Sequence, residues 1–108
     1  MSAAHDDALA ELAKCRDEIA RIDRAMLDLL AKRVRIGRRV GELKRTAGLP
    51  VLDPKREAEV VRSITTAARE LELPSEPVRD IFWHVIGLSR RVQDGTPDAG
   101  DAAPPGAR

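Results

Sequence analysis

Three basic side chains occupy positions where a helix of this sequence would be expected to carry apolar residues. Arg33 stands between Leu29 and Ile36 in a series of apolar residues that otherwise recur every three or four positions, and Arg16 lies within an earlier part of that series. Lys44 follows Arg33 by eleven residues, three helical turns later and on the same face. Lysine and arginine are almost never fully buried without a partner, because an unpaired buried charge costs several kcal/mol. These positions therefore predict an anionic ligand on the apolar face of the helix.

A small molecule with two carboxylates suits this set of cations. The planar guanidinium of arginine holds a carboxylate through two parallel hydrogen bonds. The alternative is that each cation reaches solvent along its aliphatic stem or pairs with a local acid such as Glu42 or Asp23. Taken singly, each residue fits that alternative well in a chain with 34% charged residues.

Further polar residues accompany the apolar stripes of a second predicted helix, which starts at Asp53-Pro54, and a third, from about residue 75 or 76 to 92. Glu57 lies on the apolar stripe of the second helix, one residue after Arg56, and Ser89 and Gln93 lie one turn apart beside the core of the third. Asp53 precedes a proline and is a favoured helix cap, and Glu57 also suits the positive end of a helix dipole. Each of these residues could therefore be a satisfied structural group or a ligand contact.

Other kinds of site fit the sequence poorly. His5 and His84 are far apart and have no metal-ligand spacing, so neither a metal nor a cofactor is expected. Cys15 has no nucleophile context and fits a small apolar position. A glycine-rich phosphate loop and a dinucleotide fingerprint are both absent from the sequence.

Composition narrows the class of protein further. Apolar residues (43%) and charged residues are mixed along the chain, which favours a folded domain in water. The net charge of +1 and the presence of only two aromatic residues, Phe82 and Trp83, argue against nucleic-acid binding, although Lys32 to Arg39 is a basic run. The sequence has no bilayer-spanning segment and no secretion signal, and its single cysteine suits a reducing compartment, so we expect a cytoplasmic protein.

Three helices are predicted, and together they make an all-α fold. Between about residues 6 and 44 an apolar seam repeats at intervals of three and four residues: Leu12, Cys15, Ile19, Ile22, Met26, Leu29, Ile36, Val40 and Leu43. Gly48 and Pro50 end this helix. A second helix begins at Asp53-Pro54, and a third runs from about residue 75 or 76 to 92. Gly37 and Gly41, inside the first helix, mark either a close backbone approach or a weak point.

The length of the first helix predicts a homodimer. About 39 residues at 1.5 Å each make a rod of about 58 Å, and two shorter helices cannot cover its whole seam. A two-fold partner that lays its own long helix alongside would do so, and the alternative is a monomeric bundle with a kinked first helix. We expect a flexible N-terminus at residues 1–7, a helical domain at 8–94 and a disordered tail at 95–108, where glycine, proline, alanine and aspartate dominate.

The polar residues, taken together and in order, resemble those of the all-helical (type II) chorismate mutases. The similarity covers about residues 8–94, nearly all of the chain expected to fold, and rests on the pattern Arg16 … Arg33 … Val40-Gly41-x-x-Lys44 … Pro50-Val51-x-Asp53-x-x-Arg56-Glu57 … Ser89-x-x-x-Gln93. The resemblance implies an intertwined homodimer of three-helix chains. It also implies an isomerase of aromatic amino acid biosynthesis that converts chorismate to prephenate without a metal or cofactor.

The resemblance also implies a role for each polar residue around the reacting bonds. Arg16, reaching across from the partner subunit, and Arg33 would hold the two substrate carboxylates, with Ser89 assisting. Lys44 and Gln93 would donate hydrogen bonds to the ether oxygen of the bond that breaks.

The remaining residues would surround the substrate ring. Glu57, together with Asp53, would accept a hydrogen bond from the ring hydroxyl, and Arg56 would complete the electrostatic lining. Val40 and Ile86 would form the walls.

Two alternatives stay open at this point. The same fold could act on 4-amino-4-deoxychorismate, or as a lyase on isochorismate, because Glu57 suits either a hydroxyl or an ammonium group. A non-catalytic helical dimerisation module would share the helices but would not explain why Arg33, Lys44, Glu57 and Gln93 all face inward.

Overall fold

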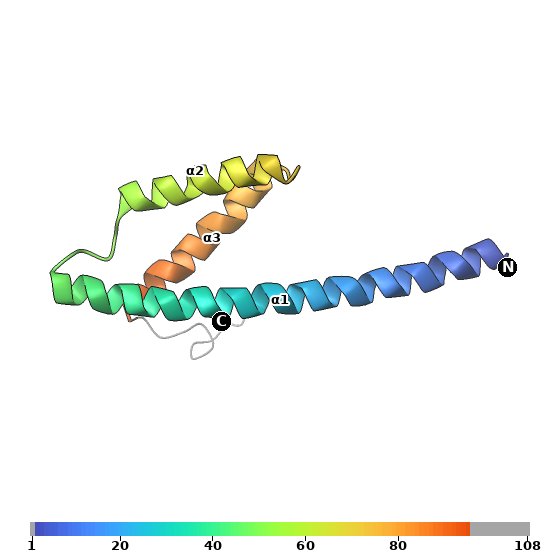
Figure 1. The fold of residues 1–108 in the computed structure, drawn as a ribbon, viewed down its shortest axis with the longest axis horizontal. Helices are drawn as coiled ribbons and strands as arrows, with labels where there is room; N and C mark the ends of the chain where they lie inside the picture. Colours follow the sequence, from blue (N-terminus) through green and yellow to red (C-terminus); the bar gives the residue numbers. More distant parts are fainter. Residues whose placement is uncertain (1, 96–108) are drawn as a thin grey trace, which may run out of the picture. The chain divides into compact units, whose positions relative to one another are not determined.

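The computed structural model describes residues 2–95 and consists of three α-helices (Figure 1). They are α1 (Ala3–Ala47), α2 (Pro54–Glu70) and α3 (Ser75–Gln93). No β-strand occurs in this described part, which confirms the all-α, three-helix prediction. Because α1 starts three residues earlier than predicted, residues 3–7 of the expected flexible N-terminus are helical. The expected tail, from residue 96 onward, lies outside the described residues.

The chain divides into two units. Among the described residues, those up to 33 form the first, which holds the N-terminal part of α1, and residues 34–95 form the second, which holds the rest of α1 with α2 and α3. In the first unit the predicted apolar seam is exposed: Leu12 is 43% exposed and Leu29 is 64% exposed, with similar values between them. A single chain therefore leaves this seam uncovered.

Local sequence signals set the helix ends in the second unit. Gly48 has a positive φ of 71°, and the amides of Gly48 and Leu49 donate to the carbonyls of Arg45 and Lys44, so a glycine C-cap ends α1. α2 begins as predicted, because the Asp53 carboxylate accepts from the Arg56 amide (3.1 Å) and Pro54 occupies the first helical position.

The core of the second unit is small: α2 packs against α3, and Val92 of α3 lies beside Gly37 of α1. Its buried apolar residues are Ala68, Ile86 and Val92. α1 contributes its two buried residues, Gly37 and Gly41. A Cβ added at Gly41 would lie 2.6 Å from the carbonyl oxygen of Gln93, closer than real Cβ atoms come. Of the two explanations offered for this glycine, close backbone approach is therefore the right one.

No helix in the described part of the chain combines the length and the apolar character needed to cross a membrane.

Candidate functional site

Lys44 is the centre of a polar cluster that joins α1 to α3 and to the connection between α1 and α2. It lies in the last turn of α1 and is half-buried. Its ammonium group donates to the carbonyl oxygen of Val51 (2.8 Å), in the connection to α2, and to Oε1 of Gln93 (2.7 Å), the last residue of α3. Two residues that were predicted to act together are therefore in direct contact, although 49 positions separate them.

Gln93 is held in one orientation by its two neighbours. Because an ammonium group can only donate, the amide oxygen of Gln93 must face Lys44 and the amide nitrogen must face away from it. That nitrogen donates to the Ser89 hydroxyl (3.2 Å), one turn earlier in α3. Lys44, Gln93 and Ser89 thus form a continuous hydrogen-bonded chain.

The backbone of Gln93 is held as well as its side chain. The guanidinium of Arg45 donates to the Gln93 carbonyl oxygen (2.8 Å), and the lack of a side chain at Gly41 lets α1 approach that carbonyl. Arg45 was not predicted as a site residue. Its position next to Lys44 was the available signal, but its partner is 48 residues away in the sequence.

Glu57 forms an ion pair that the sequence analysis did not anticipate. Nε and Nη2 of Arg90 lie 2.7 and 2.6 Å from Oε2 and Oε1 of Glu57, a bidentate arrangement that links α2 to α3. The Glu57 side chain is only 15% exposed, which confirms that it faces inward. Arg90 lies four residues after Ile86 and three before Gln93, so its helical spacing was the signal that could have identified it.

The Glu57 carboxylate is a stable anion in this setting. Hydrogen bonds from Arg90 lower its pKa below the usual range for a glutamate, and the charges of Arg90 and Lys44 act in the same direction. Partial burial and the nearby Asp53 carboxylate oppose this shift without reversing it. Glu57 is therefore a hydrogen-bond acceptor at neutral pH.

Two other residues predicted around the ring have local partners. Asp53 is the half-buried cap of α2, which confirms the structural role that the sequence suggested for it. Arg56 is exposed and forms an ion pair with Glu59 at 3.5 Å, three residues along the same helix. Exposed pairs of this kind contribute little to stability, so they leave a side chain able to change partner. Ile86 is buried and Val40 is half-buried.

The two arginines predicted to bind carboxylates belong to the first unit. Arg33 is half-buried and Arg16 is exposed. Their convergence with Lys44 in one site stays a prediction.

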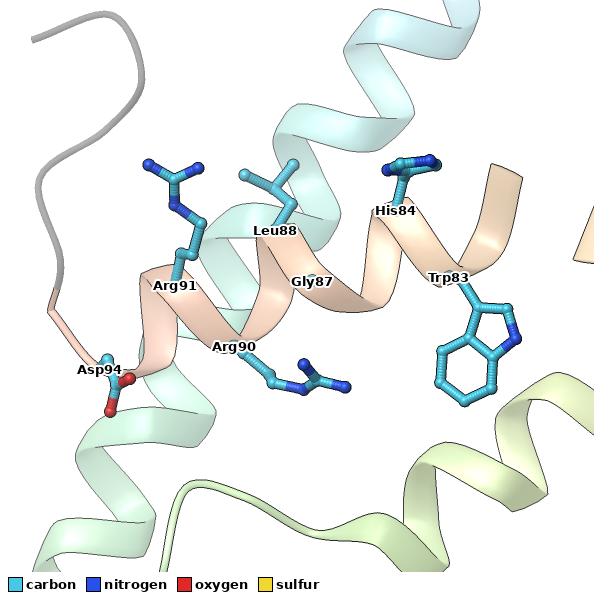
Figure 2. A pocket seen from close by; sticks show the side chains of 7 residues that line it. All are labelled: Trp83, His84, Gly87, Leu88, Arg90, Arg91 and Asp94. Atoms are coloured by element: carbon cyan, nitrogen blue, oxygen red, sulfur yellow. The ribbon is translucent and has the colours of Figure 1, made fainter. Parts of the chain in front are cut away.

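An open hollow of about 490 Å³ also lies along α3 (Figure 2). Its lining residues are Trp83, His84, Gly87, Leu88, Arg90, Arg91 and Asp94. Figure 2 shows Trp83 and Arg90 on one side of the helix and His84, Leu88 and Arg91 on the other, so their polar groups do not converge. None of the predicted site residues lines this hollow, and it is not the predicted substrate site.

Known proteins with a similar sequence or structure indicate the family of this chain. The T-protein of Enterobacter agglomerans is 41% identical over 78 residues, which are 72% of this chain and 21% of that protein, so the chain spans about a fifth of its length. The chorismate mutase of Methanocaldococcus jannaschii is 34% identical over 85 residues, which are 79% of this chain and 86% of that protein. A solved structure, a conserved hypothetical protein from Pyrococcus furiosus, superposes with a TM-score of 0.62 at 36% identity and covers 77% of this chain and 95% of its own. Residues 15–94 match the family described as chorismate mutase type II, and the chain belongs to that family.

Proposed function

We propose that this chain converts chorismate to prephenate by an intramolecular Claisen rearrangement. The observation that carries the proposal is the hydrogen bond from Lys44 to the amide oxygen of Gln93, which brings together two residues of α1 and α3 that can each donate to a substrate. In this reaction one C–O bond breaks while one C–C bond forms, and no proton moves. The protein therefore needs neither a nucleophile nor a general base. It needs to fold the substrate into a reactive conformation and to stabilise the negative charge that grows on the ether oxygen.

The hydrogen bonds of the cluster leave one donor free on each of these two residues. An ammonium group has three N–H donors, and Lys44 uses two of them, on Val51 and Gln93. A primary amide has two, and Gln93 uses one, on Ser89. We infer that the two remaining donors bind one substrate oxygen. Such preorganisation is what stabilises a developing charge without reorganising the site during the reaction.

The substrate carboxylates would be held by Arg33 and by Arg16 of the partner subunit, with the Ser89 hydroxyl assisting. Lys44 adds a third positive charge, whereas the Glu57–Arg90 pair is neutral. This balance suits a dianion. Holding both carboxylates would restrain the flexible enolpyruvyl side chain above the ring, which is the conformational part of the catalysis.

The ring would lie between Val40 and Ile86, with its hydroxyl donating to Glu57. Asp53 would assist from the start of α2, and Arg56 would turn from Glu59 toward the substrate.

A second copy of this chain would cover the apolar seam of the first unit and supply Arg16. α1 has 45 residues, and at 1.5 Å each it is about 68 Å long. The exposed seam carries leucine, isoleucine and methionine side chains, each of which can contribute at most about 1.5–3 kcal/mol to the stability of the dimer when it is fully buried. A two-fold arrangement buries the same residues on both chains.

The cytoplasmic location expected from the sequence stays a prediction.

Light scattering coupled to size-exclusion chromatography tests the dimer. The expected mass is about twice 11.8 kDa. Ile22→Asp, on the seam, should dissociate the protein and abolish activity, whereas Arg24→Asp, on the opposite face, should change neither. A monomeric wild-type protein that is fully active would contradict the proposed contribution of Arg16.

The activity is tested by the loss of chorismate ultraviolet absorbance on purified protein. Lys44→Ala should lower kcat by roughly 10²–10³-fold, the usual effect of removing one preorganised donor, while Lys55→Ala on the exposed side of α2 should not. Rates on 4-amino-4-deoxychorismate and isochorismate, measured in parallel, should be lower. A folded dimer that turns over none of these substrates and, by calorimetry, does not bind a bicyclic dicarboxylate transition-state analogue would favour a non-catalytic module instead.

A further inference from the structure

We propose that Arg90 is a positioning and specificity residue, which makes the site prefer a neutral ring hydroxyl over an ammonium group by pairing with Glu57. This inference rests on the proposed function, in which Glu57 faces the ring substituent. It adds a residue outside the predicted site, and it addresses the choice between chorismate and its amino analogue.

Arg90 binds both carboxylate oxygens of Glu57. The two hydrogen bonds of 2.6 and 2.7 Å engage both carboxylate oxygens, and they cross from α2 to α3 over a sequence separation of 33 residues. The Arg56–Glu59 pair, in contrast, joins exposed neighbours on one helix at 3.5 Å. A bidentate arginine fixes both the position and the orientation of a carboxylate. Glu57 therefore presents its free lone pairs in a fixed direction.

Pairing with Arg90 leaves Glu57 able to accept a further hydrogen bond. A carboxylate has about four lone-pair sites, and a bidentate guanidinium uses two of them. The two that remain are sufficient for a hydroxyl group, which needs only one acceptor. Glu57 can thus bind a ring hydroxyl without losing its partner.

The same pairing disfavours a cation at that position. An ammonium group bonded to Glu57 would be attracted by the carboxylate but repelled by the guanidinium a few ångströms beyond it. The other charged groups that act on Glu57 are Asp53 and Lys44, and their charges oppose each other. Arg90 is therefore the cation that decides the balance. Because its side chain is 43% exposed, solvent screens the repulsion, and we expect a discrimination of roughly tenfold.

The experiment compares kcat/KM for chorismate and 4-amino-4-deoxychorismate in four proteins: wild type, Arg90→Gln, Arg90→Lys and Arg91→Gln. Arg90→Gln should shift the ratio roughly tenfold toward the amine. Arg90→Lys keeps the charge and should stay within about threefold of wild type. Arg91→Gln removes the same charge from the adjacent exposed position of α3, and should leave the ratio unchanged. Circular dichroism on each variant checks that the helices are intact.

A second measurement follows the ion pair without any turnover. Carbon-13 NMR titration of the Glu57 carboxyl should give a higher pKa in Arg90→Gln than in wild type or Arg91→Gln. If the wild type rearranges chorismate but the ratio does not move in Arg90→Gln, the specificity role is overturned and the proposed function stands. A folded wild type that is inactive on both substrates overturns the proposed function and the specificity role together. An unchanged Glu57 pKa in Arg90→Gln overturns the pairing itself.

Discussion

Gly41→Ala tests the contact that places Gln93 beside Lys44. The added Cβ would lie 2.6, 2.8 and 3.0 Å from the carbonyl oxygen, Cα and carbonyl carbon of Gln93. All three are backbone atoms, so no rotation of a side chain can relieve the overlap. The last turn of α3 has to move away from α1, and the bond from Arg45 to the same carbonyl is strained as it does so.

The expected magnitude follows from two opposing effects. Alanine is more stable than glycine inside a helix by about 1 kcal/mol. Forcing a methyl group into a filled contact costs about 1–3 kcal/mol and sometimes more, and the backbone overlap at Gly41 places it at the upper end. We expect a net loss of about 2 kcal/mol in the free energy of unfolding. This corresponds to a fall in Tm of roughly 10 °C for a domain of this size.

Activity should fall as well, because Gln93 moves with the backbone. A shift of a few tenths of an ångström in a donor at the reacting oxygen should lower kcat roughly tenfold. Thermal unfolding at one fixed protein concentration and steady-state kinetics on chorismate measure the two effects.

Two other glycines provide matched controls. At Gly37 a Cβ would meet the side-chain atom Cγ2 of Val92 at 3.2 Å, which can shift, so alanine should change stability by less than about 1 kcal/mol. At Gly87, inside α3, nothing lies within 4 Å, and alanine should stabilise the protein by about 1 kcal/mol. If Gly41→Ala proves as stable as Gly87→Ala, the contact between α1 and α3 is not the one described.

Three further changes probe the charges of the site. Arg16→Ala should act mainly by raising KM, because the bond that it removes holds a substrate carboxylate in both the ground state and the transition state. A fall in kcat with an unchanged KM would contradict this. Gln93→Glu should confine activity to low pH, because only the protonated acid can donate to the ether oxygen, and full activity at pH 8 would refute that contact. Glu57 has a lowered folded pKa, so its ion pair stabilises the protein fully above the usual glutamate pKa, and this contribution is lost as the pH falls below about 4. Urea unfolding between pH 7 and pH 3 should therefore show a smaller acid loss in Glu57→Gln than in wild type.

Local patterns in the sequence were enough to predict the helices and most of the inward-facing polar residues. The spacing of apolar residues, the Asp53-Pro54 start of α2 and the Gly48 end of α1 are local signals, because each acts within one or two turns of the chain. The same periodicity placed Glu57 on an inner face. Lys44 and Gln93 were paired by their likeness to a known family pattern.

The partners of these residues, in contrast, depend on how the helices pack. The bidentate bond of Arg90 to Glu57, the hold of Arg45 on the last residue of α3 and the backbone contact at Gly41 join residues that are 33 to 52 positions apart. Helical spacing gives the face on which a side chain lies, but it does not give the distance or register of the helix that packs against that face. Those quantities come from the packing of α1, α2 and α3 together. For that reason, the residues missed by the sequence analysis are the ones whose partners lie on a different helix.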